Sequence, residues 1–152
     1  MKLTPANASD AAALAQAHGL GFDDPWSEAS FAELFAGAGA YGFLAWDEAR
    51  PVGMIACRAL FEDAEVLTLA VDPQARGRGV GRALLDAAVL FARQAGATAM
   101  FLEVAVDNAP ALSLYLHAGF VRAGLRKDYY DRGAGGSADA AAMRLDLPPP
   151  SP

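Results

Sequence analysis

Residues 67–82 read LTLAVDPQARGRGVGR and carry the clearest structural signal of the chain. The apolar start predicts a strand that ends at Asp72-Pro73, because proline has no amide hydrogen to give to a sheet. Glycines then occupy three alternate positions, and a segment with helical periodicity follows. Glycine lets a ligand approach the backbone closely, so amide groups at the start of this helix can converge on an anion. The segment therefore predicts a strand, a phosphate-binding loop and a helix.

Two common phosphate loops do not fit these glycines. A nucleotide triphosphate loop has the pattern G-x-x-x-x-G-K-[ST], and neither Lys-Ser nor Lys-Thr follows them. The dinucleotide fingerprint G-x-G-x-x-G has a different spacing and belongs in an N-terminal strand-helix-strand unit. The remaining description is R-x-x-G-x-G, with Arg76, Arg78 and Arg82 supplying positive charge for a phosphate. An isolated loop of this kind is also compatible with a tight, solvated turn.

The rest of the chain alternates between strand and helix patterns. Strands are predicted at 2–6, 41–47, 52–60, 65–71, 98–104, 120–126 and 140–146. Helices are predicted from a cap at Ser9-Asp10 to about His18, from a cap at Ser27, over 81–95, and from a cap at Asn108 to Gly119. The glycine-rich segment 128–137 is predicted to be a mobile loop. This order predicts a mixed sheet covered by helices, an α/β or α+β fold.

The size and composition of the chain favour one folded domain. Its 152 residues suit a single core, which we expect to span 1–147, with a frayed Pro-rich tail at 148–152. No apolar stretch reaches the ~20 residues of a membrane-spanning helix, and no basic-then-apolar leader begins the chain. We therefore expect a cytoplasmic protein that does not bind membranes. The lone Cys57 is expected to be a small buried apolar group.

The net charge of −6 opposes binding to nucleic acid and is compatible with a basic peptide substrate. The arginines of the glycine loop form a positive spot on this acidic chain, as an anionic ligand requires. His18 and His117 lie far apart in the sequence without a cysteine or carboxylate pattern, so we expect no metal. The sequence leaves the oligomeric state open, and a monomer is compatible with it.

The glycine loop, together with Asn108, Leu114-Tyr115 and Ala118-Gly119-Phe120, resembles the GNAT acetyltransferase superfamily over nearly the whole chain. The resemblance implies a GNAT fold, with a mixed, mostly antiparallel sheet of about six or seven strands flanked by about four helices. It also implies acetyl-CoA as co-substrate, its pantetheine arm held by one splayed strand and its pyrophosphate by the loop. The expected contacts are Leu69, Ala70, Val71, Arg76, Gly77, Arg78, Gly79, Val80, Gly81, Arg82 and Asn108.

Further segments resemble the RimI-type ribosomal-protein-alanine N-acetyltransferases in particular. They are Pro25-Trp26-Ser27-Glu28, Leu69-Ala70-Val71-Asp72-Pro73, Phe101-Leu102-Glu103-Val104, Arg126-Lys127-Asp128-Tyr129-Tyr130 and Asp139-Ala140-Ala141-Ala142-Met143. The resemblance implies transfer of an acetyl group to a protein N-terminus, the N-terminal alanine of a ribosomal protein. Two positions depart from the pattern, because Ala105 and Asp107 stand where many members have arginine and serine.

An acetyl acceptor must attack as a neutral amine, so a base is needed. Glu103 is the candidate base, since it stands in an otherwise apolar strand; the alternative is a solvated residue paired with an arginine. Tyr115 matches the position of the family's proton donor, although a tyrosine on an apolar helix is often simply packed. Trp26, Tyr129 and Tyr130 either frame the acceptor channel or pack in the core.

Two other functions remain open at this point. One is a GNAT acetyltransferase that acts on a small-molecule amine, because such enzymes share the cofactor loop. The other is a non-catalytic acetyl-CoA-binding module. The presence of both Glu103 and Tyr115 disfavours the second, since a binding module needs neither.

Overall fold

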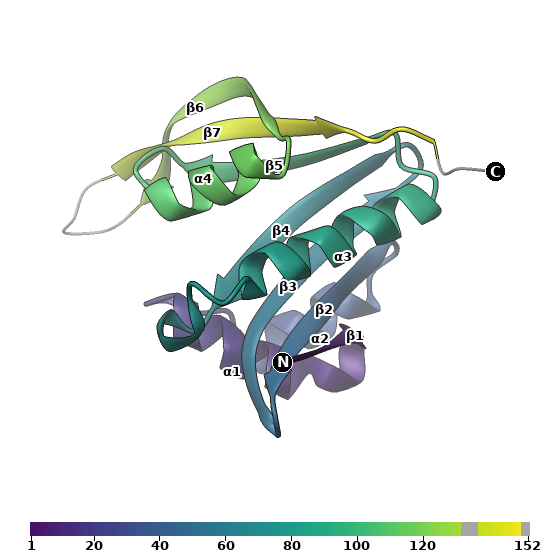
Figure 1. The fold of residues 1–152 in the computed structure, drawn as a ribbon, viewed down its shortest axis with the longest axis vertical. Helices are drawn as coiled ribbons and strands as arrows, with labels where there is room; N and C mark the ends of the chain where they lie inside the picture. The colour runs from purple at the N-terminus through teal and green to yellow at the C-terminus, as the bar shows by residue number, and fades with distance from the viewer. Residues whose placement is uncertain (132–136, 150–152) are drawn as a thin grey trace.

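The computed structural model describes residues 1–131 and 137–149, with the side chains of 125–138 outside that description. Seven strands form one sheet in the order β1-β2-β3-β4-β5-β7-β6 (Figure 1). The strands are β1 (Lys2–Ala6), β2 (Ala40–Asp47), β3 (Arg50–Leu60), β4 (Asp63–Val71), β5 (Ala99–Ala105), β6 (Val121–Asp131) and β7 (Ser137–Asp146). All neighbouring pairs described are antiparallel except β4 and β5, which confirms the mixed, mostly antiparallel sheet.

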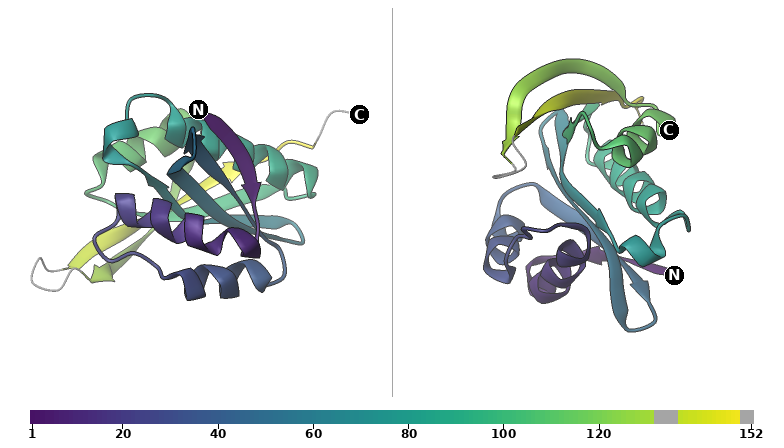
Figure 2. Two further views of the ribbon diagram at one scale, coloured as in Figure 1. Left: turned by 90° about the horizontal axis from the view of Figure 1, so that it is seen from below. Right: turned by 90° about the vertical axis from the view of Figure 1, so that its left-hand side faces the viewer.

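Helices cover both faces of this sheet. They are α1 (Ala11–Gly21), α2 (Glu28–Ala36), α3 (Val80–Gln94) and α4 (Ala109–His117). Figure 2 shows α1 and α2 together on one face and α3 and α4 on the other. No helix in the described part of the chain is both long enough and apolar enough to cross a membrane.

Each face of the sheet has its own apolar cluster. Strand β3 contributes to both, because alternate side chains of a strand point to opposite faces. Ile55 packs in the cluster under α3 and α4, whereas its neighbour Met54 packs in the cluster under α1 and α2. This explains why 52–57 reads as a continuous apolar run. Cys57 is fully buried within it, as expected.

The central strands β4 and β5 pair at one end and part along the rest of their length (Figure 1). They pair only between 63–65 of β4 and 99–101 of β5. On its other side β4 has one extra residue relative to β3, since Ala56 pairs with Thr68 and Cys57 pairs with Val66. Such a bulge at Leu67 bends and twists a strand. The end of β4 therefore turns away from β5, and its backbone on that side has no partner from β5.

The start of the chain differs from the prediction in two respects. Asp10 is the N-cap residue of α1, within the predicted Ser9-Asp10 cap, but its side chain makes no cap hydrogen bond to that helix. The cap bonds form one turn earlier, where the Asn7 side chain accepts from the Ser9 amide at 2.9 Å while Asp10 accepts from the Asn7 amide at 2.9 Å. This capping box begins a short 3-10 turn (Ala8–Asp10) that leads into α1. Helix α1 then continues past His18 to Gly21.

The predicted loop over 128–137 is also wrong at both ends. Strand pairing continues to Asp131, opposite Ser137, because the β6–β7 ladder extends beyond the apolar segments on which the prediction rested. Residues 132–136 of that loop lie outside the described residues. In the Pro-rich tail, the carbonyls of Pro148 and Pro149 accept hydrogen bonds from Arg93, and 150–152 lie outside the description.

Candidate active site

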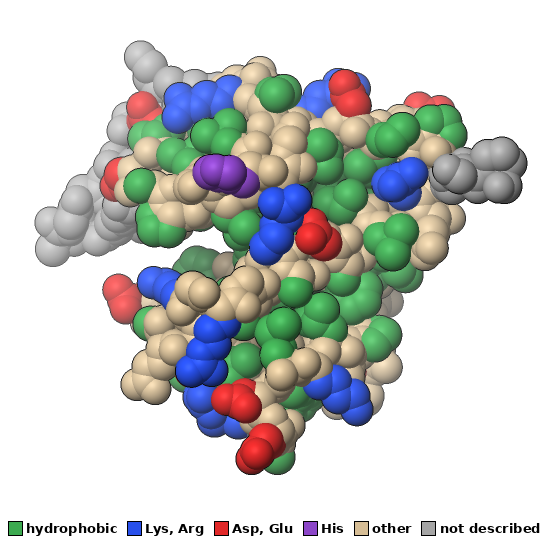
Figure 3. All heavy atoms as spheres, in the orientation of Figure 1, with side chains coloured by type: hydrophobic (Ala, Val, Ile, Leu, Met, Phe, Trp, Pro, Cys, Tyr) green, Lys and Arg blue, Asp and Glu red, His purple; other side chains and the backbone are tan. Residues whose placement is uncertain are grey.

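A cleft of about 380 Å³ opens where β4 and β5 part. Figure 3 shows it as a notch between the two halves of the molecule, with basic side chains around its edge. It is lined by Gly21, Phe22, Leu69, Ala70, Val71, Arg76, Gly77, Gly79, Val80, Gly81, Arg82, Asn108, Pro110, Ala111 and Leu114. The cleft therefore brings together every residue expected to contact the cofactor except Arg78, which is exposed and does not line it.

The glycine loop enters the cleft with an unusual backbone. Gly77 and Gly79 have φ angles of 81° and 78°, in the region that glycine adopts without strain. A Cβ atom at either position would meet nothing within 4 Å, so conformation rather than space requires glycine here. Gly79 is also the N-cap of α3 and offers no side chain to bond the first amides of the helix. Those amides carry the positive end of the helix dipole, an arrangement that suits an anion.

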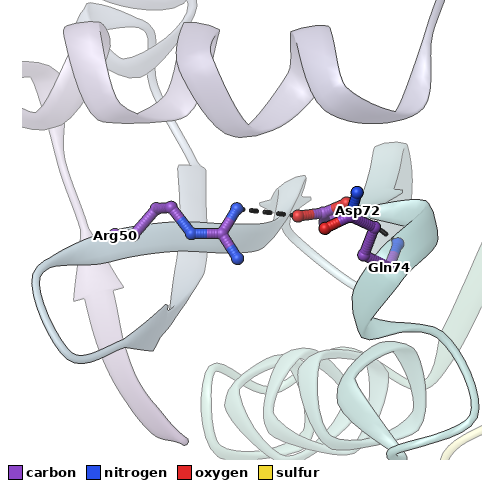
Figure 4. A network of polar contacts seen from close by, with 3 residues as sticks. All are labelled: Arg50, Asp72 and Gln74. Carbon is purple, nitrogen blue, oxygen red and sulfur yellow. Dashed lines mark hydrogen bonds and ion pairs between the residues drawn. The ribbon is translucent and has the colours of Figure 1, made fainter.

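The start of the loop is held by a buried carboxylate, Asp72 (Figure 4). Its Oδ1 accepts from the Gln74 amide at 3.0 Å, and its Oδ2 accepts from Arg50 Nη1 at 2.8 Å. The Gln74 amide, and then Arg50, lower the pKa of Asp72 below its ordinary value. The carboxylate thus stays charged and ties the end of β4 to the β2–β3 hairpin and to the loop.

Helix α4 forms the opposite wall of the cleft. Asn108 caps it, as predicted, by accepting from the Ala111 amide at 3.2 Å, and it also lines the cleft. Pro110, Ala111 and Leu114 were missed by the sequence reasoning, although Leu114 lies four residues after Pro110 and three after Ala111, which places all three on one side of the helix. That spacing was the signal available for finding them.

The end of α1 forms a third wall, which the sequence did not predict. A Cβ atom on Gly21 would lie 3.1 Å from Ala70 Cβ and 3.4 Å from the Val71 nitrogen. The helix therefore ends in close contact with the backbone of β4, and Phe22 directly follows along the edge of the cleft. This contact joins residues about fifty positions apart, and no local pattern marks it.

The two candidate catalytic residues flank the cleft without lining it. Glu103 is half-buried on β5, two residues beyond Phe101, the last residue paired with β4. It therefore belongs to the part of β5 that has separated from β4. Tyr115 is buried on α4 directly after Leu114, with its ring edge-on to Phe120 at 5.8 Å between centroids.

Among the candidate acceptor residues, the structure describes the side chain of Trp26, which does not line this cleft. Trp26 lies in the connection between α1 and α2, is 40% exposed, and lines a different hollow with Ser30, Glu33, Leu34, Gly37 and Arg58. Tyr129 and Tyr130 fall in β6, and their side chains lie outside the described part of the structure.

Known proteins match this chain over most of its length. The model of the acetyltransferase (GNAT) family matches residues 11–120. N-alpha-acetyltransferase RimI of Mycobacterium tuberculosis is 41% identical over 133 residues, which cover 85% of this chain and 80% of that protein. The ribosomal protein bS18-alanine N-acetyltransferase of Escherichia coli strain K12 is 32% identical over 123 residues, covering 81% of this chain and 82% of that protein.

The solved structures give the same result. The crystal structure of the ribosomal-protein-S18-alanine N-acetyltransferase from Escherichia coli is similar with a TM-score of 0.89 at 27% identity. The match covers 99% of this chain and 96% of that chain. Because the family model spans most of the chain and its relatives are of the RimI type, the chain belongs to the acetyltransferase (GNAT) family and is an N-acetyltransferase.

Proposed function

We propose that this enzyme transfers the acetyl group of acetyl-CoA to the N-terminal amine of a protein, specifically the N-terminal alanine of a ribosomal protein. The cleft at the parting of β4 and β5 is the observation that carries the proposal, because it combines an unpaired strand edge with a glycine-rich helix start. Similarity to RimI-type relatives supports the choice of acceptor.

The residues of the cleft fit acetyl-CoA in three respects. The end of β4 offers backbone groups that β5 does not use, and an amide-bearing pantetheine arm can pair with them like an added strand. The bare backbone at Gly77 and Gly79 leaves room for a pyrophosphate beside the first amides of α3. Arg76 and Arg82 line the same cleft and supply charge-assisted hydrogen bonds to phosphate oxygens.

Glu103 acts as the general base in this proposal. Bound acetyl-CoA supplies a thioester whose carbonyl carbon is open to attack by a neutral amine. A protein α-amine has a pKa of roughly 7.7 to 8.0, against roughly 10.4 for lysine, so only a modest base is needed. Glu103 takes the proton that the amine nitrogen loses as the new C–N bond forms, through a water where its carboxylate does not reach directly.

Tyr115 acts as the general acid. The C–S bond breaks as the amide forms, and the departing sulfur takes up a proton. Tyr115 is buried on the same helix as Ala111 and Leu114, which line the cleft, and this supports a role close to the bound cofactor. Its phenol donates that proton, and transfer proceeds directly in a ternary complex without an acetylated enzyme.

The proposal is tested by thiol release from acetyl-CoA against a panel of peptides with varied N-terminal residues. We expect acetylation of peptides with a free N-terminal alanine and none of matched N-terminally blocked peptides that contain lysine. Acetylation of small amines without acetylation of any peptide would instead identify a small-molecule acetyltransferase. Tight acetyl-CoA binding without transfer to any amine would identify a non-catalytic binding module.

A further inference from the structure

One buried histidine takes no part in the proposed chemistry. His18 on α1 is only 2% exposed, yet both of its ring nitrogens have hydrogen-bond partners. The Trp26 amide lies 3.1 Å from Nδ1, and Thr68 Oγ1 lies 3.1 Å from Nε2. An amide can only donate, so Nδ1 accepts and Nε2 carries the proton that it donates to Thr68. Burial lowers the pKa of His18 to about 4, which agrees with this neutral form.

The two partners of this imidazole come from different parts of the site. Thr68 directly follows the bulge residue Leu67 and directly precedes 69–71, the end of β4 that lines the cofactor cleft. Trp26 lies at the other end of the connection 22–27, next to Ser27, the N-cap of α2. His18 therefore joins the connection to the cofactor strand across fifty residues of sequence.

Ring contacts add to these hydrogen bonds. The imidazole stacks on Phe22 with 4.3 Å between ring centroids and on Trp26 with 5.2 Å. Phe22 lines the cofactor cleft, whereas Trp26 lines the neighbouring hollow. The connection is thus a wall between the two, held at its start and at its end by the same side chain.

We propose that His18 is a positioning residue that fixes the connection 22–27 against β4, so that the amine of the acceptor peptide meets the bound acetyl group. The acceptor part of this inference rests on the proposed function, while the anchoring of Trp26 does not. Loss of the anchor is expected to weaken use of the peptide rather than of acetyl-CoA, because the glycine loop is held separately through Asp72.

Two substitutions separate the hydrogen bonds from the packing. His18→Phe keeps an aromatic ring against Phe22 and Trp26 but removes both hydrogen bonds. His18→Gln keeps one acceptor and one donor on the same side chain and should restore most of the function. Thr68→Val removes only the hydroxyl partner at nearly the same shape, so its effect should be smaller, and it should add little to His18→Phe.

The first readout needs no acceptor. The chain has two tryptophans, Trp26 and Trp46, so Trp46→Phe leaves Trp26 as the only tryptophan to emit. Trp46 lies elsewhere and donates its Nε1 hydrogen to Thr4 on β1. In that background we expect His18→Phe to increase acrylamide quenching of Trp26 roughly twofold, as for a locally opened segment. His18→Gln should stay near the parent value, and an unchanged His18→Phe would overturn the proposed anchor.

The second readout is kinetic. His18→Phe should raise KM for a peptide with N-terminal alanine about tenfold, the effect of leaving the part-buried Trp26 amide without its acceptor. KM for acetyl-CoA should change by less than about twofold, a difference that a general loss of structure would not produce. An increase in KM for acetyl-CoA alone would overturn the acceptor role. If His18→Phe does not fold, the same comparison is made with Thr68→Val, for which about threefold is expected.

Failure of the proposed function remains distinguishable from failure of this inference. If the wild type acetylates no peptide while His18→Phe releases Trp26, the anchor stands and the acceptor assignment falls. If the wild type acetylates the peptide and His18→Phe changes neither readout, the inference on His18 falls and the proposed function stands.

Discussion

The proposed cofactor wall and the proposed acceptor wall of this enzyme are built in opposite ways. The cofactor wall is the wall of the cleft that one segment, 69–82, provides through its backbone amides, glycines and arginines. The acceptor wall is the connection 22–27, held by side-chain contacts between α1, β4 and its own aromatic residues. The first depends on backbone conformation, and the second depends on packing between distant segments.

The two walls should therefore tolerate different kinds of substitution. In the glycine loop, any side chain at the positive-φ glycines strains the backbone, whatever contacts the loop makes with distant segments. An anchored connection is sensitive to the loss of a few distant contacts and otherwise accepts change.

Glu103 stands outside both walls, so its loss should affect neither binding step. We expect Glu103→Gln to lower kcat by about 100-fold or more, the usual contribution of a general base, with KM for acetyl-CoA unchanged. Steady-state kinetics measures both values. Glu65→Gln removes an exposed carboxylate from the neighbouring strand β4 and serves as the control with wild-type turnover. Wild-type kinetics in Glu103→Gln would remove this residue from the mechanism.

Arg76 and Arg78 should contribute differently to acetyl-CoA affinity. Arg76 lines the cleft and Arg78 does not. Arg76→Gln is expected to raise the dissociation constant of acetyl-CoA about tenfold or more, since a hydrogen bond to a charged group contributes about 1.5–3 kcal/mol. Arg78→Gln should change it by less than about twofold, as for an exposed charge. Calorimetric titration of each variant gives the comparison, and equal effects would mean that charge alone, without position, matters in this loop.

The glycines of the loop should show a conformational effect. Alanine at Gly79 must adopt a positive φ, at a cost of about 1–2 kcal/mol. We expect Gly79→Ala to raise KM for acetyl-CoA about fivefold, because the strain displaces the first amides of α3. Gly96, just beyond the other end of α3, also has a positive φ and open space around it. Gly96→Ala should therefore destabilise the fold about as much as Gly79→Ala, seen as a lower melting temperature, without altering KM for acetyl-CoA. If both variants raised this KM equally, the effect of Gly79→Ala would not come from the glycine loop itself.

The contribution of His18 to the stability of the fold should depend on pH. His18 has a folded-state pKa of about 4, below its unfolded value of 6.5. Between these values the unfolded chain binds more protons, so the stabilisation is complete above pH 6.5 and is lost progressively down to about pH 4. A single proton gives at most about 1.4 kcal/mol per pH unit. Denaturant unfolding of the wild type should show this slope, and His18→Gln should lack it.

The contribution of Asp72 to stability should be lost at a lower pH than that of His18. Its folded-state pKa is lowered, so its contribution is present above the ordinary aspartate value of about 3.9 and is lost as the pH falls through the folded value. The stability of Asp72→Asn should converge with that of the wild type only at such acid pH. Convergence already near pH 5 would mean that the Arg50 and Gln74 contacts do not hold this carboxylate charged.

The strands, helices and glycine loop were largely predictable because their signals are local. Proline at position 73 ends a strand, Ser27 and Asn108 cap helices, and Gly96 closes α3, as the structure confirms. The first cap was right in position but not in its bonds: Asp10 precedes α1, whereas the capping side chain is Asn7, one turn earlier. Asn7, Ser9 and Asp10 are all suitable caps at nearly the same place, and the local pattern does not choose among them. The loop over 128–137 was drawn too long because a strand pair can extend into polar residues.

The order of elements and the strand, glycine loop and helix that begin at residue 67 follow from the sequence alone, since each rests on neighbours along the chain. Only the tertiary structure decided that β4 bulges at Leu67 and leaves β5, that Arg78 stays outside the cleft, and that Gly21 meets the backbone of β4. It also decided that His18 joins Thr68 to Trp26. Those facts depend on contacts between segments that are separated in the sequence, which the packing of helices on a twisted sheet brings together and no local pattern records.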